Sequence, residues 1–493
     1  MKNISLLIFL LSFISSQYAF SQTNYLEKSS TKNSIKQDEK YFEIEYEEAN
    51  NYFTHSMNPW DKGTSTRKGL IWANSATFLK VDTLYLQSGA AYYSKTEFHH
   101  NKLYTIPYGS EELKSISKSE LKNYYVKTLA YSPALVLEYF NKQDFKDLMV
   151  KSENNKNITF SLHIGDYYVS VQIDKESYFV NRISTLSANE EDDQFYGFGD
   201  IEDVYIYKNY VQVENRFAPT QIIKNELNGQ LSDTINVKNL KITKKTQDII
   251  PDPKDYSIQE DVIEKPDISV EHYSENIYLI NLHHSGTRSL LVEFNDFLLV
   301  AEAPLNSRYG EQLLAEVRKI HPLKPIKYFV FGHFHPHYTG GIRPFINEGA
   351  KVICVKEDEE YIKHIVDAKH TLKPDSLAIN PKEVQFENIY QAKTITDGKF
   401  YMSIYHIGKK SNHTNDYLIF YFPKEKMIFQ DDLVWIEKDT NKSNISDLTK
   451  GFYQAVKDLN LDVEEVVQNW SIFDRNNKMI FKFKDIENIF END

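Results

Sequence analysis

The densest group of chemically active side chains lies in the ten residues Gly332–Gly341. Histidines alternate there as His333, His335 and His337, directly after the apolar run Tyr328–Phe331. An apolar run that ends in glycine is typical of a buried strand that opens into a loop. Imidazoles gathered at such a position are common ligands of transition metals. The segment therefore predicts a metal site at the end of a buried strand.

The residues around this segment alternate between strand and helix patterns. Apolar runs predict strands at 276–281, 289–294, 297–302, 326–331 and 352–355, and helical periodicity predicts helices at 311–319 and 342–347. Strands that alternate with helices favour an α/β layered domain, which we expect to span 269–493.

This second region resembles the metallo-β-lactamase fold superfamily over essentially all of 269–493. Phe297–Pro304 is similar to the strand before the family's first long helix, and Lys324–Val330 is similar to the strand that leads into its metal loop. Gly332–Gly341 falls where the family has H-x-H-x-D-H-x-G-G. Lys409–Thr414 resembles the loop that gives a third metal-binding histidine, and Phe422–Leu433 resembles the strand pair that ends in the metal-bridging aspartate.

The resemblance implies a first zinc site made of His333, His335 and His413, with Asp432 as the bridging carboxylate. Three neutral imidazoles leave one tetrahedral position for a water molecule, which zinc activates as a nucleophile. Asp432 could instead complete a closed four-ligand site, and the zinc would then be structural. Its neighbour Asp431 is predicted to be a loop carboxylate.

The family's second zinc site is altered in this chain, so one zinc ion is expected. His337 stands where the family has aspartate, Tyr338 stands where it has histidine, and Trp470 stands at its last histidine; no histidine follows His413. Phenol is a poor zinc ligand at neutral pH and indole offers only a donor N–H. His337 is predicted to act in catalysis, as a ligand or general base, or else to pack beside Pro336 or face solvent.

These residues leave two main hypotheses of function. The first is an exported hydrolase whose single zinc activates water on an ester, amide, thioester or phosphoester. The second is a pseudoenzyme of the same fold that binds a ligand or a partner. The fold by itself does not specify β-lactam hydrolysis or any other substrate.

The region 41–245 shows short runs of alternating polarity, as in Thr159–Ile164 and Tyr167–Ile173, which predict antiparallel strands. One helix is expected at Ser132–Met149, with Ser132-Pro133 as its start signal.

The stretch Tyr205–Ile242 resembles the half-open barrel of periplasmic lipoprotein-carrier proteins. That resemblance implies a lipid or peptide ligand; the alternative is a structural domain that orients the other. The whole chain is thus predicted to be an α+β multidomain protein with a proline-containing linker at 246–268.

Composition restricts the partners and the compartment. The 493-residue chain has a net charge of −13 and no Lys/Arg-rich block, which argues against nucleic-acid binding. Its single cysteine, Cys354, permits no intrachain disulfide and is predicted to be an inert core thiol rather than a ligand or nucleophile.

The first 22 residues have the pattern of a secretory signal peptide, with a basic start, an apolar run from Ile4 to Ile14 and a small polar end. The apolar run is too short to favour a membrane-spanning helix, and no transmembrane anchor is predicted elsewhere. Residues 23–40 are expected to be a flexible lead-in. The mature protein is therefore predicted to be periplasmic or extracellular.

The remaining histidines are weaker candidates for metal ligands. His283-His284 and His99-His100 are expected in solvated loops, and His406 is expected in a strand near the site.

Overall fold

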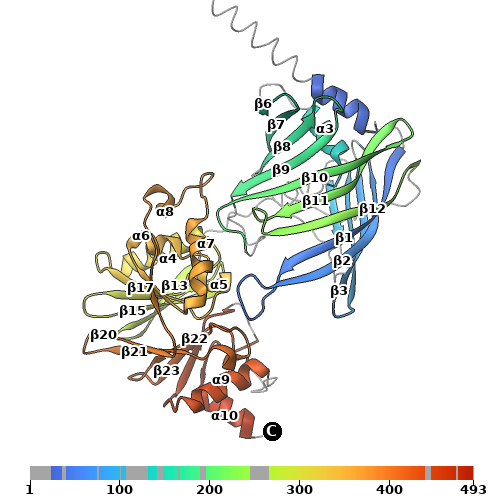
Figure 1. The fold of residues 1–493 in the computed structure, drawn as a ribbon. Helices are drawn as coiled ribbons and strands as arrows, with labels where there is room; N and C mark the ends of the chain where they lie inside the picture. Colours follow the sequence, from blue (N-terminus) through green and yellow to red (C-terminus); the bar gives the residue numbers. More distant parts are fainter. Residues whose placement is uncertain are drawn as a thin grey trace, which may run out of the picture. The chain divides into compact units, whose positions relative to one another are not determined.

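The computed structural model describes residues 24–35, 40–74, 77–99, 102–106, 131–141, 148–164, 167–188, 196–244, 266–438, 446–472 and 476–491 (Figure 1). The predicted signal peptide and residues 246–265 of the predicted linker lie outside these ranges. The chain divides into two compact units. The first comprises Met1–Tyr52, Lys62–Ala188 and Ile201–Val262; the second comprises Phe53–Asp61, Asn189–Asp200 and Ile263–Asp493.

The first unit contains one twelve-stranded sheet of order β5-β4-β3-β2-β1-β12-β11-β10-β9-β8-β7-β6. Strand β1 pairs antiparallel with β12, and most other neighbours in the sheet are consecutive in the chain and antiparallel, as short turns between alternating segments require. The strands are β1 (Lys40–Phe53), β2 (Lys62–Ala73), β3 (Phe78–Leu86), β4 (Ala91–His99), β5 (Lys102–Ile106), β6 (Met149–Glu153), β7 (Asn157–Ile164), β8 (Tyr167–Asp174), β9 (Val180–Ala188), β10 (Asp200–Val213), β11 (Arg216–Glu226) and β12 (Leu231–Lys244).

Helix α3 (Pro133–Asn141) packs its apolar side chains on this sheet. Leu135, Leu137 and Phe140 share one buried core with residues of β1, β7 and β8. The predicted helix Ser132–Met149 is therefore confirmed at its start and wrong at its end. Met149 begins β6, where it pairs with Ser161, because strand pairing competes successfully for this segment.

Residues 24–33 are helical, and Leu26 and Asn33 are buried. The prediction of a flexible lead-in is wrong for this segment. Asn33 donates hydrogen bonds to the backbone carbonyls of Ser29 and Tyr178, so a polar sequence is ordered here by contacts with distant residues.

The second unit contains two mixed sheets. The seven-stranded sheet has the order β13-β14-β15-β16-β17-β18-β19, and the six-stranded sheet has the order β20-β21-β22-β23-β24-β25. Their strands are β13 (Ile268–Ser274), β14 (Ile277–Leu282), β15 (Thr287–Glu293), β16 (Leu298–Ala301), β17 (Ile326–Val330), β18 (Lys351–Cys354), β19 (Gln385–Asn388), β20 (Ala392–Thr396), β21 (Tyr401–His406), β22 (Leu418–Phe422), β23 (Met427–Gln430), β24 (Glu465–Gln468) and β25 (Ile480–Lys482).

Side chains of β22 show how these sheets form layers. Leu418 and Phe420 enter a core that also holds Val330 of the other sheet, so the two sheets face each other. Ile419, which points to the opposite face, joins a second core with Phe452 of α9. Alternation along the strand thus gives the six-stranded sheet one face for the partner sheet and one for helices.

The helices of the second unit are α4 (Ser307–Ile320), α5 (Pro336–Thr339), α6 (Arg343–Glu348), α7 (Glu359–Asp367), α8 (Ser376–Ile379), α9 (Asp447–Asp458) and α10 (Phe483–Glu491), with 3₁₀ turns η1 (Lys356–Asp358) and η2 (Gly408–Ser411). In Figure 1, α4, α6, α7 and α8 lie beside the seven-stranded sheet, and α9 and α10 lie beside the six-stranded sheet. This helix–sheet–sheet–helix arrangement is the fold predicted by the resemblance to the metallo-β-lactamase superfamily. Within the described residues, we find no helix that is both long and apolar enough to cross a membrane.

Candidate metal centre

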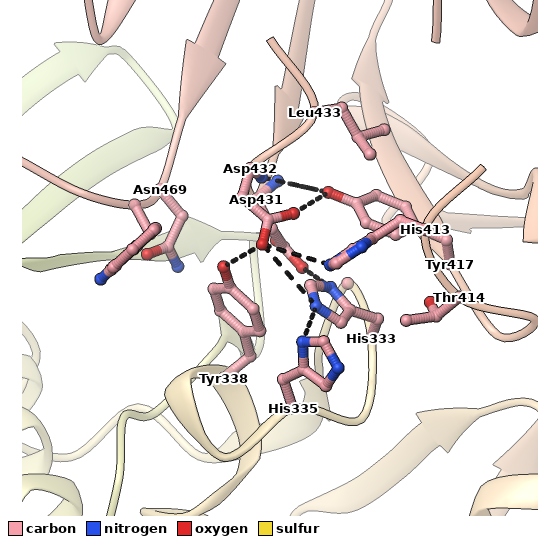
Figure 2. Close-up of polar contacts among 12 residues, drawn as sticks. His333, His335, Tyr338, His413, Thr414, Tyr417, Asp431, Asp432, Leu433 and Asn469 are labelled. Atoms are coloured by element: carbon pink, nitrogen blue, oxygen red, sulfur yellow. Dashed lines mark hydrogen bonds and ion pairs between the residues drawn. The ribbon is translucent and has the colours of Figure 1, made fainter. Parts of the chain in front are cut away.

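The predicted metal-binding residues come together from three separate loops of the second unit. His333 and His335 follow β17, His413 follows η2, and Asp432 follows β23. One ligand atom from each of these four residues lies within 4.8 Å of every other (Figure 2). His333 and His335 are buried, while His413 and Asp432 are partly exposed.

Two of the distances between donors are close to those of a tetrahedral zinc ion, while Nε2 of His333 and Oδ2 of Asp432 lie 3.9 Å apart. Nε2 of His333 lies 2.9 Å from Nδ1 of His335, and Nε2 of His413 lies 3.4 Å from Oδ2 of Asp432. Two ligands of a tetrahedral zinc with bonds of about 2.0–2.1 Å lie about 3.3 Å apart. In addition, Nε2 of His413 is buried and makes no hydrogen bond within the described residues. A buried nitrogen of this kind fits the role of a metal ligand.

Asp431, next to Asp432, holds His333 in place. Its Oδ2 lies 2.6 Å from Nδ1 of His333, and both side chains are fully buried. A carboxylate on the outer nitrogen fixes the ring so that Nε2 points into the donor group, as is common for metal-binding histidines. The expectation of a simple loop carboxylate is therefore wrong for Asp431, because its loop folds inward against the histidine segment.

Glycine is required at position 332 to let Asp431 approach. A Cβ atom on Gly332 would lie 2.1 Å from Oδ2 of Asp431. The backbone N–H of Gly332 also donates a 3.1 Å hydrogen bond to Glu302, which follows β16. The glycine that opens the motif therefore allows close packing behind the histidines.

Glu302 and Asp431 form a buried carboxyl pair behind His333. Burial raises the pKa of Glu302 to about 7, and burial together with the Glu302 carboxyl raises the pKa of Asp431 well above its usual value. Asn469, just after β24, donates a hydrogen bond to the second oxygen of Glu302. At neutral pH the pair therefore retains a proton that the same groups lose in the unfolded chain.

Two phenols hold Asp432. Tyr338 donates a 3.1 Å hydrogen bond to Oδ2 of Asp432, and Tyr417 donates a 3.3 Å hydrogen bond to Oδ1. Burial raises the pKa values of both tyrosines well above 10, so both remain protonated donors. Tyr338 thus supports the site through a hydrogen bond.

His337 lies outside the group of four donors. Its ring is partly buried and lies 5.2 Å from the ring of Trp470 and 5.8 Å from that of Tyr338. Burial, followed by the nearby His55, lowers the pKa of His337 to about 4. The imidazole is therefore neutral at physiological pH.

The pKa values of the three imidazoles in the donor group are shifted in different directions. Burial and the neighbouring histidines lower the pKa values of His333 and His335 well below 6.5, which keeps them in the neutral form that metals bind. Burial also opposes charge on His413, but Asp432 outweighs this effect and raises the pKa of His413.

His55 is one of the residues near the site that the sequence did not predict. His55 belongs to Phe53–Asp61, which follows β1 in the chain but forms part of the second unit. Its ring centre lies 4.6 Å from that of His335 and 6.1 Å from that of His337. No local spacing connects His55 with the motif, so only tertiary structure reveals their proximity.

The remaining candidates from the sequence do not contribute donors. His283, His284 and His406 lie outside the donor group, and Cys354 is buried in β18 as predicted. His99 ends β4, and His100 lies outside the described residues.

Comparison with known proteins gives matches only among solved structures. No family model matches the chain, and no curated protein matches it. A metallo-β-lactamase from Pontibacter korlensis is similar over 46% of this chain and 100% of its own length, with 16% identity and a TM-score of 0.34. The mono-zinc form of the metallo-β-lactamase FIM-1 from Pseudomonas aeruginosa covers 46% of this chain and 95% of its own, with 14% identity and a TM-score of 0.33.

A flavodiiron protein from Giardia intestinalis is also similar, over 46% of this chain and 59% of its own, with 11% identity and a TM-score of 0.32. The first two of these neighbours carry the name of the family that the sequence resembles. Similarities at this level do not assign an activity, a metal or a substrate to this chain.

Proposed function

We propose that the second unit is a hydrolase with one zinc ion, held by His333, His335 and His413 beside Asp432. The observation that carries this proposal is the convergence of four donor atoms within 4.8 Å of one another. When bound there, zinc would lower the pKa of a water molecule and make it a nucleophile near neutral pH.

The chain's own residues have separate tasks in this proposal. Asp431 orients the ring of His333 through its 2.6 Å contact with Nδ1. Tyr338 and Tyr417 donate hydrogen bonds that fix the Asp432 carboxylate beside His413. Asp432 is then placed to accept a proton from water at the site. His337 remains a predicted catalytic base, since a neutral imidazole can accept a proton, although it lies outside the donor group.

Metal analysis of the purified protein tests this proposal. We expect about one zinc per chain in the wild type and loss of that zinc in His335→Ala. The matched control is His272→Ala, which removes an exposed imidazole from β13 at the far edge of the seven-stranded sheet. Absence of zinc, iron and other transition metals from a wild-type protein refolded or expressed with excess metal would contradict the proposal.

The alternative is a pseudoenzyme with a structural zinc. Four protein donors, with Asp432 as the fourth, can close a tetrahedral site and leave no position for water. Substitution of cobalt for zinc distinguishes the two functions. The visible spectrum of a hydrolytic site should change on addition of a small anion that displaces water, whereas a closed site should give an unchanged spectrum.

A separate proposal concerns the first unit, which we infer to bind a small apolar ligand. A narrow cavity beside α3 is lined mainly by apolar side chains, including Phe42, Ile71 and Ile235. The probe N-phenyl-1-naphthylamine should fluoresce more strongly with the full chain than with Ala218→Phe, which narrows the cavity. Equal fluorescence would favour the purely structural role.

Export through the predicted signal peptide also remains a proposal. Expression of the full gene followed by N-terminal sequencing of the protein outside the cytoplasm should find a chain that begins near Gln22. Retention of Met1 would contradict it.

A further inference from the structure

A continuous row of five aromatic rings borders the donor group. It runs from His335 to His55, His337, Trp470 and Trp435, with successive ring centres 4.6, 6.1, 5.2 and 5.9 Å apart. Both ends of the row contact donor residues. One end is His335 itself, and at the other end the indole N–H of Trp435 donates a 3.1 Å hydrogen bond to the backbone carbonyl of Asp432. We call these five residues the aromatic row.

Solvent reaches the centre of this row. His55 is exposed, and His337, Trp470 and Trp435 are partly exposed, whereas His333, His335 and Asp431 are buried. The exposed part of the site therefore includes these aromatic rings as well as the partly exposed donors His413 and Asp432. Large rings that remain partly exposed beside a polar centre are typical of binding surfaces for flat apolar groups.

The segment that carries His55 is fixed to the second unit by its own contacts. The backbone N–H of Asn415 donates a 2.9 Å hydrogen bond to the carbonyl of Met57, and the hydroxyl of Tyr196 donates a 3.2 Å hydrogen bond to the carbonyl of Thr54. These bonds hold the backbone on both sides of His55. Asn415 lies only two residues after His413, so the segment is attached directly to a donor loop.

Ring packing holds the far end of the same segment. The indole of Trp60 packs edge-on against Tyr361 and His364, with ring centres 5.3 and 4.9 Å apart. Within the segment, the Asp61 carboxylate accepts hydrogen bonds from the side chain of Ser56 and the backbone N–H of Asn58. His55 is thus presented by an ordered turn, which suits a residue that contacts substrate.

We propose that the aromatic row binds an aromatic or other flat apolar group of the substrate, and that His55 determines this specificity. The inference rests on the proposed function, because the row surrounds the residues that would hold the metal. It names the substrate class as an ester, amide or thioester with a planar apolar substituent next to the bond that is cleaved. A small, highly charged substrate would make little use of these rings.

Binding of two thiols to the zinc-loaded full chain tests the proposal without any need for turnover. Thiolates bind zinc directly, so phenylmethanethiol and ethanethiol share an anchor and differ in the ring that the row would contact. Calorimetry should show that the wild type prefers phenylmethanethiol. His55→Ala should reduce this preference about 3- to 10-fold and leave the affinity for ethanethiol within about twofold of wild type.

Three further variants make the result specific. His55→Phe restores a ring without imidazole nitrogens and should keep the preference, whereas His55→Leu keeps bulk without a ring and should lose it. His272→Ala, which removes an exposed imidazole stacked on Tyr278 in another part of the unit, should behave as wild type. An unchanged preference in both His55→Ala and His55→Leu, or a preference lost in His55→Phe, overturns this inference alone. Failure of both thiols to bind the zinc-loaded wild type overturns the proposed open, hydrolytic site together with the inference.

Discussion

Asp431→Asn should separate metal affinity from stability, because Asp431 has a different effect on each. The amide is nearly isosteric with the carboxylate. Its oxygen can accept the hydrogen bond from Nδ1 of His333, and its N–H₂ can donate to Glu302. The substitution therefore keeps the hydrogen bonds around position 431 and removes the carboxylate that faces the proposed metal ligand His333.

The expected loss of zinc affinity follows from the 2.6 Å contact between Asp431 and His333. Removal of a carboxylate that orients a metal-binding histidine typically costs about 10- to 100-fold in metal affinity, or about 1.4–2.7 kcal/mol. A titration of the apoprotein with zinc against a coloured chelator measures this change.

The stability of the apoprotein should move in the opposite direction. In the wild type, burial raises the pKa of Glu302 from 4.5 to about 7, so the folded state holds a proton that the unfolded chain has lost. Stability conferred by this protonated pair is present below about pH 4.5 and is lost as the pH rises to about 7. In the Asp431→Asn variant, Glu302 can ionise next to an amide donor. We expect the variant to be more stable than wild type at pH 8 by up to about 3 kcal/mol.

Urea unfolding of the metal-free proteins at pH 5 and pH 8 provides this comparison. Asp447→Asn is the control, since that carboxylate is 81% exposed and should leave zinc affinity unchanged. Zinc affinity of Asp431→Asn within twofold of wild type would refute the assigned role of Asp431, whatever its stability.

Three other substitutions test the site and its support. Gly332→Ala places a Cβ 2.1 Å from the Asp431 carboxylate, so we expect the free energy of unfolding in urea to fall by about 1–3 kcal/mol and zinc binding to weaken. Wild-type values for both quantities would contradict this packing. His337→Ala should retain its zinc, because the ring lies outside the donor group, and metal loss on dialysis would show that His337 is a ligand. Burial raises the pKa of Asp416 to about 6 and that of its buried neighbour Asp358 well above its usual value, so the wild type should lose stability as the pH rises from about 4 to 6. Asp358→Asn should flatten this pH dependence and add about 1–3 kcal/mol to the free energy of unfolding at pH 8. Equal urea midpoints for the two proteins at pH 8 would disprove this prediction.

The sequence predicted elements best where the pattern is local and strong. The strands at 326–331 and 352–355 correspond to β17 and β18, and the predicted helix 342–347 corresponds to α6. Prediction from the sequence was wrong where the local preference for helix or strand is weak. Residues 24–33 are polar yet helical, and the segment at Met149 pairs as a strand because its partner lies in β7. Such pairings depend on residues that no local window contains.

Residue type and spacing were enough to predict which side chains could bind a metal. The spacing of His333 and His335 after a buried strand, together with the resemblance that pointed to His413 and Asp432, named the four donors that the structure brings together. This was possible because two donors share one short loop, and the other two lie in segments with recognisable strand flanks.

The surroundings of those donors depend on the folded structure. Asp431 and Asp432 are adjacent and chemically identical, yet one lies behind His333 and the other lies among the donors, because the turn after β23 directs their side chains to different places. His55 reaches the site from a segment more than two hundred residues earlier in the chain. Donor identity is a local property of residue type and spacing, whereas orientation, charge environment and access to the site depend on contacts that form only when distant segments pack together.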